Sequence, residues 1–141
     1  MPDTTIDTLL VKAQGRICAL RLTDVIETLR PLEIQPMASA PRFVRGAAVV
    51  RGRATPVVSL ARLFGGADET GARWVSLRAG VALEVDEVVG LHGFAPGDLA
   101  AAAPLLGDAL REHAEALAVL DGQLVAVIRA ARLLPDREVN R

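Results

Sequence analysis

The chain has 141 residues, of which 51% are hydrophobic and 23% charged, and its formal net charge is −1. This length fits one domain or two small units that share a core, and the apolar fraction excludes intrinsic disorder of the whole chain. A net charge so close to zero gives no general attraction to nucleic acid or to acidic lipid.

The first apolar runs predict short strands separated by turns. Residues 9–11 and 17–22 flank Gln14-Gly15 and predict two strands joined by a turn. Thr23-Asp24 predicts either a helical turn or the start of a third strand, which would run to Leu29 and end before Pro31.

The next segment predicts an irregular connection, a hairpin and a short helix. Residues 32–41 contain two prolines and predict the connection. The strands 47–50 and 55–60 flank Arg51-Gly52-Arg53 and predict a β-hairpin with glycine in its turn. Helical spacing then predicts a helix over 60–64, which two glycines end.

The second half repeats this style after a polar stretch at 67–72, where we place a subdomain boundary. Strands are expected over residues 73–77, 81–85, 88–91, 117–120 and 124–128, with Asp121-Gly122 as the turn of the last hairpin. The alanine-rich region 95–116 predicts helical turns at 99–103 and 108–117, and a last turn is expected at 130–134. The pattern as a whole predicts a mainly all-β fold with a few short helices, and the two similar halves indicate a loose duplication.

Few residues suit catalysis, metals or redox chemistry. His92 and His113 have no cysteine or carboxylate at ligand spacing, so each is interpreted as a surface histidine. Glu84 and Asp86 are interpreted as solvated carboxylates beside a turn. The single cysteine, Cys18, excludes an internal disulfide and is interpreted as a small buried hydrophobe. We therefore predict no enzyme activity, no cofactor and no metal.

The densest charge comes from four arginines, Arg42, Arg45, Arg51 and Arg53. Nucleic-acid binding would need stacking aromatics beside them, and only Phe43 is present. A hairpin face that contacts another protein is favoured, because arginine is enriched at protein interfaces; a plain solvated hairpin stays the alternative. No apolar leader follows Met1, and no run reaches the roughly 18 residues of a membrane span, so a cytoplasmic location is expected.

Four segments form an ordered set of short motifs. They are Ala19 to Glu27, Val44 to Leu60, Leu83 to Gly90, and Asp121 to Leu134. The second contains Gly46, the Arg51-Gly52 turn and a Pro-Val-Val strand start. Together they resemble the CheW-like family of chemotaxis coupling proteins.

The resemblance implies a CheW-like domain over residues 9–134, built from two intertwined five-stranded SH3-like β-barrels around a shared apolar core. The first barrel is expected at about 16–66 and the second at about 73–128, with strand exchange, and residues 1–8 and 135–141 are expected to be flexible termini. The resemblance also implies a non-catalytic adaptor. It would couple the cytoplasmic tips of chemoreceptors (methyl-accepting chemotaxis proteins) to the regulatory domain of a CheA-type histidine kinase, and would be recruited to membrane-associated receptor arrays.

Site residues are carried over by position. The resemblance implies that Gly46, Val49, Arg51 and Gly52 bind the receptor, and that Val25, Glu27 and Arg45 bind a partner, kinase or receptor. Each glycine also has a structural reading, since both can serve tight backbone geometry, and Val25 can be core.

One position departs from the family pattern. The family usually has asparagine where this chain has Val49, and valine cannot make that side chain's hydrogen bonds. The alternative function is a small-molecule-binding regulatory β-barrel, which predicts a closed apolar pocket with convergent polar groups.

Overall fold

Short strands form where the branched apolar runs occur, and the computed structural model describes them within residues 5–66, 70–100 and 112–133. The first half contains β1 (Ile6–Ala13), β2 (Arg16–Arg21), the 3-10 helix η1 (Leu22–Asp24), β3 (Val25–Leu29), β4 (Val44–Val50), β5 (Arg53–Ser59) and α1 (Leu60–Leu63). The second half contains β6 (Arg73–Leu77), β7 (Val81–Val85), β8 (Glu87–Phe94), η2 (Pro96–Asp98), β9 (Ala114–Leu120), β10 (Gln123–Ile128) and η4 (Ala130–Arg132). Within these residues no helix is long and apolar enough to cross a membrane.

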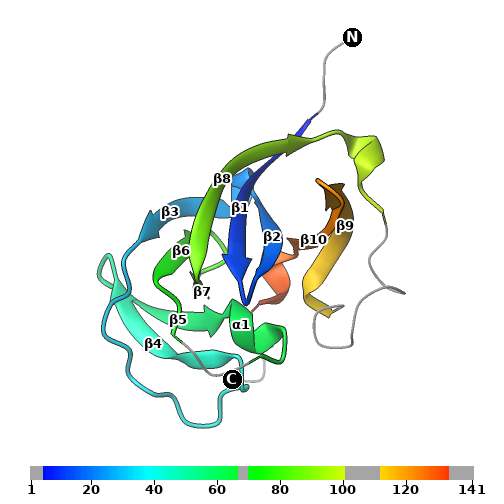
Figure 1. The fold of residues 1–141 in the computed structure, drawn as a ribbon. Helices are drawn as coiled ribbons and strands as arrows, with labels where there is room; N and C mark the ends of the chain where they lie inside the picture. The colour runs from blue at the N-terminus through cyan, green and yellow to red at the C-terminus, as the bar shows by residue number, and fades with distance from the viewer. Residues whose placement is uncertain (1–4, 67–69, 101–111, 134–141) are drawn as a thin grey trace.

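The strands form two five-stranded sheets, and each sheet takes strands from both halves of the chain (Figure 1). The terminal sheet has the order β8-β1-β2-β10-β9, and the middle sheet has the order β3-β6-β7-β5-β4. In each sheet one pair is parallel, β2 with β10 and β5 with β7, while the other pairs are antiparallel. The prediction of an all-β fold with two five-stranded units and a few short helices is confirmed.

The sheets divide the chain differently from the expected barrel limits of about 16–66 and 73–128. The middle sheet uses strands between residues 25 and 85, and the terminal sheet uses those at 6–21 and 87–128. The difference arises because each half gives its first two strands to one sheet and its last three to the other. In addition, β1 begins at Ile6 and pairs with β8, so part of the stretch 1–8 belongs to a sheet instead of a flexible end.

The described residues form three apolar clusters. One draws on both sheets and includes Leu20, Leu60, Leu83 and Ile128, so it forms the shared core. A second lies among strands of the terminal sheet, and a third, around Trp74, lies among strands of the middle sheet. Each fully buried aliphatic side chain contributes about 1.5–3 kcal/mol relative to exposure, so these clusters are the main source of stability.

Cys18 lies in the shared core and is 1% exposed. Burial raises the pKa of its thiol to about 12. Because the thiolate is the reactive form, this cysteine is chemically inert in the folded protein. Its interpretation as a small buried hydrophobe is confirmed.

The helical expectation for residues 108–117 is wrong from Ala114 onward, although residues 112–113 are helical. Residues 114–117 belong to strand β9, in which Ala116 pairs with Val127 and Ala118 with Val125. Alanine is a strong helix former, but pairing with the apolar strand β10 buries these small side chains and overrides that preference. The expected turn at 99–103 and the rest of 108–117 lie largely outside the described residues.

Candidate functional site

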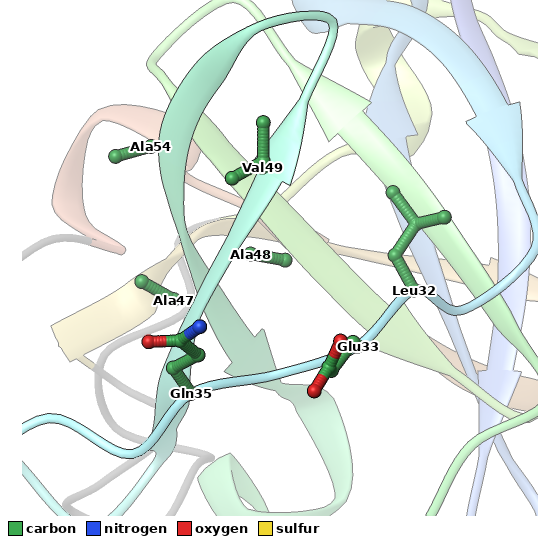
Figure 2. A pocket seen from close by; sticks show the side chains of 7 residues that line it. All are labelled: Leu32, Glu33, Gln35, Ala47, Ala48, Val49 and Ala54. Carbon is green, nitrogen blue, oxygen red and sulfur yellow. The ribbon is translucent and has the colours of Figure 1, made fainter.

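A shallow groove follows the outer face of the β4–β5 hairpin. Its volume is about 310 Å³, and Figure 2 shows its lining side chains, Leu32, Glu33, Gln35, Ala47, Ala48, Val49 and Ala54. Val49 is 68% exposed and Leu32 is 44% exposed, so two aliphatic side chains of this region face solvent. An open apolar surface flanked by polar groups is typical of a protein-docking site.

The wall formed by residues 32–35 is held to β4 by backbone hydrogen bonds. The Gln35 amide donates to the Ala47 carbonyl at 2.8 Å, and the Ala47 amide donates to the Gln35 carbonyl at 2.9 Å. Gly46 permits this approach, because a Cβ at that position would lie 2.3 Å from the Gln35 carbonyl oxygen. Its φ of +150° is also a conformation that favours glycine. Gly46 is buried, so it shapes the groove from below.

Arg51 and Gly52 form the turn of the hairpin, with φ values of 52° and 79°, as two-residue type I′ turns require. The Arg51 guanidinium donates two hydrogen bonds to the Glu27 carboxylate on β3: Nε to Oε2 and Nη2 to Oε1, both 2.7 Å. Strands β3 and β4 are the two edges of the middle sheet. This ion pair therefore connects the turn that follows edge strand β4 to the opposite edge strand, β3.

The pairing shifts the pKa of both partners. The hydrogen bond from Arg51 holds the pKa of Glu27 below its ordinary value, and the same bond raises the pKa of the Arg51 guanidinium. Because the pKa of Glu27 is lowered in the folded state, the stability it contributes is present above the unfolded value of about 4.3. That contribution is lost as the pH falls through the lowered folded value.

We expect an NMR titration of the Glu27 side-chain carboxyl carbon to show a midpoint below about 4.3 in the wild-type protein. In an Arg51→Gln variant the midpoint should move back up toward that value, because the charge-assisted hydrogen bonds are gone. Identical midpoints in the two proteins would show that the ion pair does not persist in solution.

Two other predicted partner residues point inward. Val25 is half-buried and packs against the shared core. The Arg45 side chain is 11% exposed, and its Nε donates to Oε1 of Glu84 at 2.5 Å. Val25 therefore contributes to core packing and Arg45 to a buried ion pair, and their role in partner binding stays a prediction.

The interpretation of Glu84 as a solvated carboxylate is wrong. Its side chain is 2% exposed, and its carboxylate pairs with Arg45. Glu84 is the fourth residue of strand β7, and all five residues of that strand are buried. By contrast, Asp86 is exposed, and its Oδ2 accepts a hydrogen bond from the backbone N–H of Gln14 at 2.9 Å.

The histidines are also less exposed than the sequence indicates. His113 is 6% exposed, its ring meets that of Phe43 edge-on at 5.2 Å, and its Nδ1 lies 3.0 Å from the Arg132 carbonyl oxygen. His92 is half-buried, with its ring 4.5 Å from that of Phe94. Within the described ranges, no group of three or more potential ligand side chains is placed to hold a metal ion.

The β9–β10 hairpin occupies the equivalent place in the terminal sheet. Its turn is Asp121-Gly122, and Val119 pairs with Leu124 across it, as Val49 pairs with Ala54. Val119 is 62% exposed and Leu124 is 60% exposed. These two residues, like Leu32 and Glu33 of the groove, were not predicted as site residues. Val119 and Leu124 are apolar residues close to a turn, and Leu32 and Glu33 lie in an irregular connection, so no motif marks them in the sequence.

A second hollow of about 340 Å³ is lined by residues of β1, β2 and η1, and a third of about 310 Å³ by residues of β1, η1 and β8. Both are lined by Asp7 and Leu22. Leu22 is 38% exposed, and Leu91 in the third hollow is 72% exposed, so both open to solvent. None of these hollows is the closed apolar pocket that a small-molecule-binding domain requires.

Two exchanged β-sheets around a shared core, with exposed aliphatic side chains at the hairpins, define a small all-β domain of two five-stranded units. The family model of the CheW-like domain matches residues 7–138, and the chain therefore belongs to the CheW-like domain family. The matched range includes the predicted domain 9–134, whose limits stay a prediction.

A solved structure has the same fold. It is the crystal structure of the scaffolding protein TtCheW from Thermoanaerobacter tengcongensis, which is 20% identical, with a TM-score of 0.77 and a match that covers 89% of each chain. The search of curated proteins finds no match.

Proposed function

We propose that this protein is a cytoplasmic signalling adaptor that couples chemoreceptors to a CheA-type histidine kinase, in chemotaxis or in a similar two-component pathway. It would act by binding alone, without catalysis or a cofactor, at membrane-associated receptor arrays. Family membership supports this proposal. The observation that carries it is the open apolar groove near the hairpin turn where Arg51 pairs with Glu27.

The groove and the ion pair suit recognition of a helical receptor tip. Val49 and Leu32 offer exposed aliphatic surface, which an amphipathic helix can cover. The Arg51 side chain is 76% exposed, and its bonds to Glu27 use Nε and one Nη2 hydrogen. The remaining guanidinium hydrogens can bond a partner. Because Glu27 holds the side chain in place, docking costs less conformational entropy.

The apolar half of the proposal is tested with Val49→Asp and a matched control, Val119→Asp on the equivalent hairpin. Both valines are exposed to a similar degree, 68% and 62%. We expect Val49→Asp to weaken binding of a receptor-tip fragment at least about tenfold, equivalent to about 1.4 kcal/mol, because a charge would be desolvated in the groove. Val119→Asp should bind the receptor fragment as the wild type does. Isothermal titration calorimetry gives both affinities.

The charged half is tested with Arg51→Glu and the double exchange Arg51→Glu/Glu27→Arg. We expect Arg51→Glu to weaken receptor binding while circular dichroism shows an intact fold, since an exposed turn residue contributes little to the core. The double exchange restores an ion pair but not the arginine at the turn. If Arg51 contacts the receptor, the double variant stays weak; recovery of binding would show that Arg51 acts only through Glu27.

The same titrations are run against the regulatory domain of a CheA-type kinase. Binding of wild type to both partners, alone and in a ternary mixture, is the expected result for an adaptor. A wild-type protein that binds neither partner would remove the proposal. Glu27 and Val25 stay candidate kinase or receptor contacts.

A further inference from the structure

A polar donor and a polar acceptor lie inside the middle sheet without hydrogen bonds. Trp74 on β6 and Glu84 on β7 are directly opposite each other in the antiparallel β6–β7 pair. Trp74 is 0% exposed and Glu84 is 2% exposed. The Trp74 Nε1 atom and the Glu84 Oε2 atom are both buried and have no hydrogen-bond partner among the described residues.

The strand register brings these two side chains together. Directly opposite residues of an antiparallel pair project to the same face of the sheet, with Cβ atoms about 4.5–5.5 Å apart. On this face Trp74 belongs to the cluster that also contains Val57, Ala48 and Ala82. Two of these neighbours are alanines, which have small side chains.

Leaving such groups unpaired is costly. A buried polar group without a hydrogen-bond partner destabilises the folded state, and a charged one does so more strongly. The other carboxylate oxygen of Glu84, Oε1, already accepts from Arg45 Nε. An indole Nε1–H only donates, and a carboxylate oxygen only accepts. A molecule that bridges them must therefore accept one hydrogen bond and donate another.

We propose that one buried water molecule bridges Trp74 and Glu84, accepting from Nε1–H and donating to Oε2. Buried waters occur about once per 27 residues and make two to four hydrogen bonds to such orphaned groups. Ser59, which is buried and lies opposite Glu84 in the parallel β5–β7 pair, offers a third polar partner. The water extends the Arg45–Glu84 pair into a chain of contacts that joins β4, β7 and β6.

This chain of contacts stiffens the strand that carries the docking groove. Arg45 precedes Gly46 on β4, and the water fixes the carboxylate that holds Arg45. The inference does not depend on the proposed adaptor function, because it concerns the interior of the sheet alone.

The first test is NMR of the wild-type protein. Trp74 is the single tryptophan of the chain, so its indole N–H gives one unambiguous signal. We expect a nuclear Overhauser cross-peak between this proton and a long-lived water, together with slow exchange of the proton with solvent. An indole proton without a water cross-peak would overturn the proposal.

The second test is a crystal structure of the same protein at a resolution that shows ordered waters. We expect one water about 2.7–3.2 Å from both Trp74 Nε1 and Glu84 Oε2. A direct bond between Nε1 and Oε2, or a bridging group other than water, would overturn it. A Trp74→Phe crystal gives a second check, since the water should lose one partner and become weaker in density or disappear.

Discussion

The Gly46→Ala variant is expected to lose about 3 kcal/mol of unfolding free energy. The new Cβ would lie 2.3 Å from the Gln35 carbonyl oxygen, a distance at which the chain must move. Movement breaks the two backbone hydrogen bonds between Gln35 and Ala47, each about 1 kcal/mol, and the φ of +150° adds about 1 kcal/mol of backbone strain, at the lower end of the usual range. Urea unfolding followed by circular dichroism measures the loss.

Gly90→Ala is the matched control for that variant. Gly90 has almost the same φ, +152°, but a Cβ there would meet no atom within 4 Å. It should therefore lose only the strain component, about 1 kcal/mol, and keep receptor binding. Gly46→Ala should also lose receptor binding under conditions where it is still folded, because the groove wall is displaced. Equal losses of stability in the two variants would contradict the steric explanation.

Local turn chemistry made the hairpins predictable from sequence. Arg51-Gly52 and Asp121-Gly122 each lie between apolar runs, and both turns have the positive φ values that glycine favours at the second position. The one-turn helices after β5 and β10 were predictable for a similar reason, since Leu60, Leu63 and a following glycine pair mark the first of them. These features depend on residues close in sequence, and sequence patterns report them directly.

The strand exchange between the sheets was not predictable from the residues in this way. It depends on parallel contacts such as Cys18 with Ala126 and Val57 with Ala82, which join runs of the same apolar composition. Any of several such runs would satisfy the alternation pattern equally well. Here the resemblance to a family supplied the expectation of exchange, and the hydrogen-bond register supplied the actual partners.

The candidate site shows the same division between local and distant information. The resemblance singled out Val49 and Arg51 as receptor-binding residues, and the structure places both side chains at exposed positions of the β4–β5 hairpin. Arg45 looked like another arginine of the same surface, because the sequence does not show that a glutamate from β7 lies within reach. The groove wall at residues 32–35 was missed as a site, since its place beside β4 depends on the bridge between Gln35 and Ala47.

Arg45→Met is expected to cost about 3 kcal/mol of stability, and Arg45→Met/Glu84→Met is expected to recover most of it. Removing Arg45 leaves the Glu84 carboxylate, 2% exposed, without its positive partner. Breaking a buried ion pair on one side typically costs about 3–5 kcal/mol, whereas replacing both partners by apolar residues of similar size is often nearly neutral. The double variant should therefore unfold in urea within about 2 kcal/mol of wild type.

The double variant also decides what Arg45 does for the protein. If Arg45 only supports β4 from inside the sheet, the recovered double variant should bind receptor and kinase fragments with wild-type affinity. If Arg45 contacts a partner, as the family resemblance implies, the double variant should be stable and yet bind weakly. Stability and affinity are measured on the same preparation, so a loss of affinity at recovered stability is not caused by global unfolding. The buried geometry of the pair, with 11% of the Arg45 side chain exposed, favours the first outcome.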